Sequence, residues 1–141
     1  MSTEAKIPTP VEVIETMDMA ANHGDLVNIV NLFTDDASIN FQQPVPPFQT
    51  SYKGKEQILN YLKTLVTKDF HVESSNFRVA GNEVTWDSQI SGEQIRKMGL
   101  DRAQITNHAV LWGALIQSIT IMPSEQLLEK AQASMAVQGQ R

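Results

Sequence analysis

Histidine is the side chain best suited to proton transfer near neutral pH, and the chain contains three histidines. His23, His71 and His108 are far apart in the sequence, and no two have the spacing of a metal-binding pair. The motifs of serine hydrolases, dinucleotide-binding loops, phosphate-binding loops and zinc proteases do not occur. The sequence therefore predicts neither a metal site nor a cofactor, and His108 is the candidate catalytic residue because of the strand in which it lies.

The predicted strand around His108 sorts its side chains between two faces. Because successive side chains of a strand point in opposite directions, one face carries Arg102, Gln104, Thr106 and His108. The other face carries Ile105, Asn107, Ala109 and Leu111. Two interpretations of the polar face fit this pattern: a surface that meets solvent or a second subunit, and the wall of a cavity in which His108 exchanges protons.

The preceding strand carries Trp86, which shares a face with Val84 and Ser88, whereas Asp87 points the other way. Trp86 is either a core residue or part of a pocket wall. Asp35 and Asp36 are typical of a turn rather than of a catalytic pair of carboxylates.

Composition limits the classes of partner. The chain has 141 residues, of which 41% are hydrophobic and 19% charged, as expected for one folded domain. A net charge of −5 disfavours nucleic acid and anionic membranes as partners. Cysteine is absent, and the start of the sequence has no apolar signal segment, so we expect a cytoplasmic protein. We predict an arm over 1–9, one domain over 10–136 and a frayed tail over 137–141.

Capping signals and apolar spacing predict four helices. Thr9-Pro10-Val11-Glu12 forms a capping box before the first helix, which Gly24 ends, and Asp25 caps a short second helix. A third helix is predicted from Gly54 to about Lys68, and a last one opens at Pro123. Between the second and third, three prolines within 42–53 predict an ordered surface loop, and the family resemblance described below implies that this loop forms the mouth of a cavity.

The rest of the sequence has the period of strands. Predicted strands cover 37–41, 70–79, 83–90, 101–111 and 115–122, with a short helical insert around Ile95. This order predicts an α+β fold in which a curved antiparallel or mixed sheet packs against helices on one face. Such a curved sheet can leave a cavity between the two layers.

Several segments resemble the nuclear transport factor 2-like superfamily, which has a cone-shaped, cystatin-like fold and includes ketosteroid isomerases, SnoaL-like polyketide cyclases and limonene epoxide hydrolases. The resemblance covers about residues 10–135 and is strongest for bacterial SnoaL-like proteins. It is carried by the segments 24–39, 52–58, 84–88, 98–101 and 115–120.

The resemblance implies a pocket inside the cone but not the isomerase reaction. The positions that match the isomerase's catalytic tyrosine and two acids hold Met17, Phe41 and Thr106, which cannot perform that proton transfer. The ligand pocket implied by the resemblance and by strand period consists of Met17, Phe41, Phe48, Tyr52, Trp86, Thr106 and His108.

The sequence thus predicts a protein that holds an apolar or weakly polar small molecule in the cone. Two alternatives stay open: an enzyme of the cyclase, isomerase or dehydratase type that uses His108, and a dimeric scaffold module without a ligand. We also expect a homodimer through the outer sheet face. That expectation rests on an apolar set that is interspersed with polar residues on the last two strands: Ile105, Ala109, Leu111, Ile116 and Met122.

Overall fold

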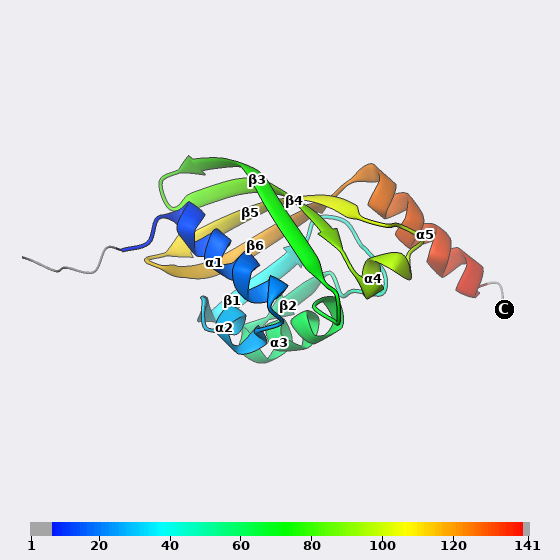
Figure 1. Cartoon of the computed structure of the whole chain (residues 1–141), viewed down its shortest axis with the longest axis horizontal. Coiled ribbons are helices and arrows are strands. Elements are labelled where there is room, and N and C mark those ends of the chain that lie inside the picture. The colour runs from blue at the N-terminus through cyan, green and yellow to red at the C-terminus, as the bar shows by residue number, and fades with distance from the viewer. Residues whose placement is uncertain (1–6, 140–141) are drawn as a thin grey trace, which may run out of the picture.

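A six-stranded mixed sheet and the helices packed against it form the body of the molecule (Figure 1). The computed structural model describes residues 7–139 and, within this range, the side chains up to residue 133. The strands are β1 Phe33–Phe41, β2 Ser51–Lys53, β3 His71–Ala80, β4 Glu83–Ser91, β5 Ala103–Trp112 and β6 Leu115–Pro123. Their order in the sheet is β2-β1-β6-β5-β4-β3, with β1 and β6 parallel and every other pair antiparallel.

Five helices complete the described chain: α1 Pro10–Asn22, α2 Leu26–Val30, α3 Gly54–Leu65, α4 Glu93–Arg96 and α5 Glu125–Gly139. In Figure 1, α1 crosses the sheet near β3, while α2 and α3 lie beside β1 and β2. This arrangement confirms the predicted α+β cone with a mixed sheet. The predicted arm and tail lie partly outside the described residues, and α5 continues through the predicted start of the tail to Gly139.

The first two helices begin and end as the sequence predicts. The Thr9 hydroxyl accepts a hydrogen bond from the Glu12 amide at 3.2 Å, and the Glu12 carboxylate accepts one from the Thr9 amide at 2.9 Å. Gly24 has a φ of +69°, which glycine adopts without strain, and it separates the two helices. Asp25 then caps α2 by accepting a hydrogen bond from the Asn28 amide at 3.3 Å.

Strand β1 begins four residues earlier than predicted, and β2 lies inside the predicted loop. Phe33 continues the apolar spacing of α2 in the sequence, but it pairs with Ile116 of β6 and is buried in the sheet. Residues 51–53 follow the last proline of the loop, so their amides are free to pair with 38–40 of β1. Tertiary pairing therefore overrides the local signal in both places.

The core lies between the helices and the inner face of the sheet, the face on which Val84, Trp86 and Ala109 are buried. Trp86 is 1% exposed, and Phe77 stacks on it with ring centroids 6.4 Å apart. The alternation predicted for β4 and β5 is present throughout both strands. It fixes which side chains lie under the helices and which lie on the opposite, outer face.

The capping box of α1 supports a first prediction. Replacing Thr9 by Ala removes the side-chain acceptor for the Glu12 amide and should lower the free energy of unfolding by about 1 kcal/mol in urea titrations. Thr9→Ser is the matched control, because it keeps the hydroxyl and should retain most of the stability. Equal losses in the two variants would show that the hydroxyl does not stabilise the helix.

Candidate functional site

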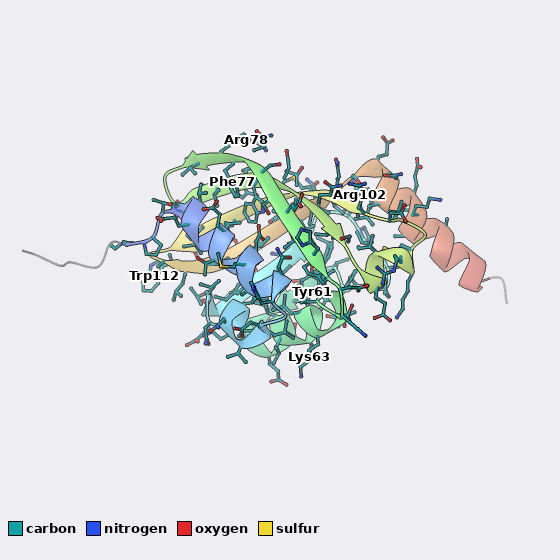
Figure 2. The ribbon with its side chains drawn as sticks, viewed as in Figure 1. Tyr61, Lys63, Phe77, Arg78, Arg102 and Trp112 are labelled. Carbon is teal, nitrogen blue, oxygen red and sulfur yellow. The ribbon has the colours of Figure 1, made fainter. Side chains whose placement is uncertain are left out.

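A cavity of about 90 Å³ lies between the inner sheet face and helices α1 to α3. Its lining is mainly apolar and includes four aromatic side chains: Phe33, Tyr61, Phe70 and Trp86. Tyr61 lies within the body of the molecule, whereas Trp112 lies at the edge, where it is 71% exposed (Figure 2). Protein interiors are otherwise packed to the density of organic crystals, so a void larger than a water molecule is a distinct feature of the core.

A short row of polar side chains crosses this apolar lining. Asn107 of β5 donates from Nδ2 to the Ser88 hydroxyl of β4 at 3.1 Å. Ser88 in turn shares a 2.9 Å hydrogen bond with the hydroxyl of Ser74 on β3. Asn107 and Ser88 are each only 5% exposed, so these bonds offset the cost of burying them. The row ends beside Asp18 of α1, which also lines the cavity.

Asp18 is a half-buried carboxyl whose charged form is disfavoured. Burial raises its pKa from 3.8 to about 6, and the charge of Glu15 acts in the same direction. The neighbouring Ser74 side chain favours the charged form and acts against burial. Asp18 therefore changes its charge close to neutral pH, inside a site that is otherwise apolar.

Tyr61 joins the cavity to a smaller extension of about 20 Å³, because it lines both. Its ring lies 4.9 Å from that of Tyr52, 5.5 Å from Phe48 and 6.0 Å from Phe41, measured between centroids. Burial raises the pKa of the Tyr61 hydroxyl, so the group stays protonated. This hydroxyl forms no hydrogen bond with any described residue.

The structure divides the predicted pocket residues into three groups. Met17 and Trp86 line the cavity, and Phe41 and Phe48 line its extension. Tyr52 is buried next to Tyr61 but lines neither space, and its hydroxyl accepts a hydrogen bond from the Gln49 amide at 2.9 Å. The loop before β2 thus covers the extension with Phe48, and its role as a mouth stays a prediction.

His108 and Thr106 lie on the outer face, which corrects their assignment to the cavity. His108 contacts the Thr85 hydroxyl through Nδ1 at 2.9 Å and the Glu83 carboxylate through Nε2 at 2.8 Å. Thr106 donates to Asp87 at 2.9 Å. The physical reason is burial: the helices cover the more apolar face of β5, so Asn107 and its alternate neighbours face the cavity. His108 is therefore not placed to exchange protons with a ligand there.

The same alternation corrects the basis of the predicted dimer. Ala109, Leu111 and Ile116 are buried on the inner face, and Ile105 lines the cavity. Of the apolar set named for the outer face, Met122 lies opposite the outward-facing Thr106, and both Met122 and Ile105 border the hollow on that face. The dimer itself stays a prediction.

Reasoning from the sequence missed Asp18, Tyr61 and the row Ser74–Ser88–Asn107. A signal for Asp18 was present: it lies four residues after Ile14 and three before Ala21, on the apolar stripe of α1. A carboxylate on such a stripe is either paired or perturbed. Tyr61 similarly adjoins the apolar stripe of α3, but no local pattern indicates that its hydroxyl lacks a partner.

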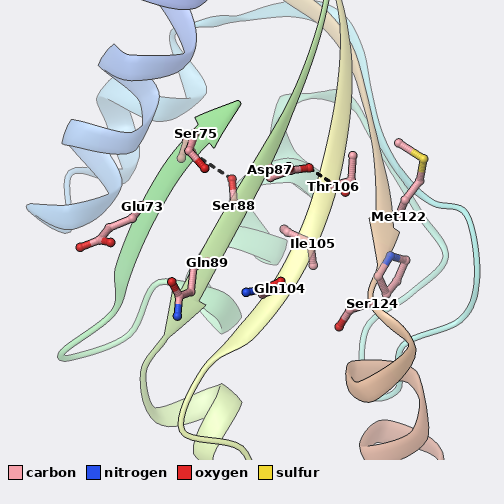
Figure 3. A pocket seen from close by; sticks show the side chains of 12 residues that line it. Glu73, Ser75, Asp87, Ser88, Gln89, Gln104, Ile105, Thr106, Met122 and Ser124 are labelled. Atoms are coloured by element: carbon pink, nitrogen blue, oxygen red, sulfur yellow. Dashed lines mark hydrogen bonds between the residues drawn. The ribbon is translucent and has the colours of Figure 1, made fainter. Parts of the chain in front are cut away.

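The outer face carries a second, open hollow of about 640 Å³ (Figure 3). Its side chains are mostly polar and include Asp87 and Gln89 of β4 and Gln104 of the neighbouring strand β5. Hydrogen bonds from Asn76 and Thr106 hold the pKa of Asp87 below its usual value. Asp87 is therefore fully ionised at neutral pH, in contrast to Asp18.

Within 7–139, no group of three or more His, Cys, Asp or Glu side chains is arranged to hold a metal ion. None of the helices in this range combines the length and apolar character needed to cross a membrane.

Comparison with known proteins identifies the fold. No family model and no curated protein matches the sequence. Among solved structures, a candidate isomerase from Bacillus subtilis has a TM-score of 0.70 at 17% identity, over 89% of this chain and 93% of that one. An NTF2-like protein of unknown function from Cytophaga hutchinsonii gives 0.69 at 13% identity, over 90% and 99%.

A candidate polyketide cyclase from Sinorhizobium meliloti gives a TM-score of 0.65 at 14% identity, over 81% of this chain and 99% of that one. These similarities show that the chain has the NTF2-like, cystatin-like fold, as the sequence resemblance implied. One such scaffold carries many unrelated reactions, so the fold alone does not define the chemistry of the cavity.

The raised pKa of Asp18 generates a prediction for stability. Because this pKa is higher in the folded chain than in the unfolded one, the folded state binds more protons between pH 4 and 6, and stability falls as the pH rises through that interval. In urea titrations, the free energy of unfolding of the wild type should fall by roughly 2 kcal/mol between pH 4 and 7, relative to that of Asp18→Asn. Asp36→Asn, at an exposed position, should follow the wild type. Parallel curves for all three proteins would contradict the assignment.

Proposed function

We propose that this protein binds a small, mainly apolar molecule in the cavity beneath α1 to α3. The observation that carries the proposal is the cavity itself, an apolar and partly aromatic space crossed by a short polar row. Ligand sites of this kind combine apolar walls with a few polar groups that fix orientation. A void that served no purpose would be expected to fill, because each one costs packing energy.

The volume limits the ligand. An apolar cavity of about 150 Å³ in another protein stays dry and takes up benzene. At about 90 Å³, this cavity is smaller, so without side-chain movement it favours a molecule smaller than benzene, or the apolar end of a longer one. The extension beside Tyr61 is a further small space into which lining side chains could move when a ligand of benzene size enters the cavity.

Binding can be tested with benzene and 1-butanol as probes, by titration followed with NMR. Saturable shifts are expected at cavity residues such as Trp86 and Ile119. Ala21→Leu adds an isopropyl group into the cavity and should abolish binding while preserving or raising the melting temperature. Met19→Leu, on the exposed side of the same helix, is the control and should bind as the wild type does. Absence of saturable binding to both probes would refute the proposal.

An enzyme of the cyclase, isomerase or dehydratase type is the second candidate. The observation that favours it is Asp18, because a carboxyl that titrates near neutral pH is suited to general acid–base catalysis. Tyr61 adds a neutral hydroxyl to the same lining. In this enzyme hypothesis, Asp18 is the residue that transfers the proton, instead of His108.

We further propose that the protein forms a homodimer through the outer sheet face. The interface would be centred on Val110 instead of on the apolar set predicted from the sequence. Val110 is half-buried on that face of β5, between His108 and the exposed Trp112. Val110→Glu would place a charge at the centre of the interface, so light scattering should give the mass of two chains for the wild type and of one chain for the variant. Val79→Glu, at an exposed position on the edge strand β3, should remain dimeric. A wild-type mass of one chain would exclude the dimer.

A further inference from the structure

The charge and the aromatic lining of the cavity point to one class of ligand. We propose, as an extension that rests on the binding function above, that the cavity holds a small aliphatic or aromatic amine as its ammonium ion, with the Asp18 carboxylate as the counter-ion. The apolar part of the amine would lie among the cavity side chains and the ammonium group at the α1 edge.

The charges around the site favour a cation. Among the described residues that line the cavity, Asp18 is the only one with an acidic or basic side chain apart from the phenol of Tyr61. Glu15, on the same helix, adds negative charge, and the strands that face Asp18 contribute the uncharged Ser74, Ser88 and Asn107. A carboxylate or phosphate ligand would meet repulsion here without an arginine or lysine in the lining, whereas an ammonium ion would supply the missing positive charge.

The aromatic walls favour the same ligand. Trp86, Tyr61, Phe33 and Phe70 contribute to the lining, and the faces of such rings attract ammonium groups. Phe77 stacks on Trp86 and helps to fix its ring. An apolar molecule with a positive end therefore gains both from burial and from the rings.

The free hydrogen-bonding groups of the lining can act as acceptors, as an ammonium ion requires. An ammonium group has three donors and no acceptor. Asn107 uses its amide nitrogen on Ser88, while its carbonyl oxygen forms no hydrogen bond with any described residue. The Tyr61 hydroxyl is likewise without a hydrogen bond to described residues, so the lining offers acceptors from β5 and α3 in addition to the Asp18 carboxylate of α1.

The proposal fixes the pH range of binding. The carboxylate of Asp18 forms as the pH rises through about 6, and an alkylamine loses its proton above roughly pH 10. Affinity for an amine should therefore be greatest between these values and should fall as the pH drops from 7.5 to 5. A neutral alcohol of the same shape should show no such dependence.

The decisive comparison is n-butylamine against 1-butanol, titrated by NMR into the wild type at pH 7.5. We expect the wild type to bind the amine roughly fivefold to tenfold more tightly than the alcohol. Asp18→Asn should lose most of the preference for the amine, whereas Asp36→Asn should keep it. Asp18→Asn keeps the size of the side chain and removes only its charge. The fall in the wild type's preference for the amine from pH 7.5 to 5 tests the role of that charge without a mutation.

The outcomes separate this inference from the proposed function. If the alcohol binds as well as the amine, or if Asp18→Asn keeps the preference, the amine proposal is wrong while cavity binding stands. If Ala21→Leu leaves amine binding unchanged, the amine binds to surface carboxylates, and the amine proposal is again wrong. If neither probe binds and benzene also fails, the proposed function itself is refuted.

Discussion

The pairing register between β4 and β5 determines which side chains reach the cavity. Trp86 is opposite Asn107, so the largest fully buried side chain and a buried amide share the inner face. Thr85 is opposite His108, which places the imidazole and its two partners on the outer face. A shift of one residue in this pairing would place Trp86 and Asn107 on opposite faces of the sheet and would break the hydrogen bond between Asn107 and Ser88. The site therefore depends on hydrogen bonds of the backbone before it depends on any side chain.

Asp18 and the cavity both reduce the stability of the fold. A carboxyl with a raised pKa costs free energy at neutral pH, and a void forfeits dispersion contacts. The row Ser74–Ser88–Asn107 offsets part of this cost by satisfying buried polar groups. Features that oppose stability and occur together at one place are typical of a functional site.

The sequence predicts the fold well because its signals are local and mutually consistent. Thr9, Gly24 and Asp25 mark helix ends, and strand period identifies both hairpins. The sequence predicts the site less well, because strand period gives two faces without saying which one the helices cover. Thr106 and His108 were assigned to the cavity on the basis of a resemblance, whereas burial of the more apolar face places Asn107 there. The start of β1 at Phe33 also depends on a partner strand remote in the sequence.

The separation of β1 and β6 in the sequence has a consequence for how the chain folds during synthesis. The parallel pair β1–β6 joins segments about 80 residues apart, and β6 separates β1 from the rest of the sheet. During synthesis, α1 to α3 and β1 emerge long before the strand that connects them to β5. Their apolar surfaces have no complete sheet to cover them until β6 has left the ribosome. Folding of this core therefore waits for β6, and the segments that precede β6 are the ones that must be kept from aggregating while the chain is growing.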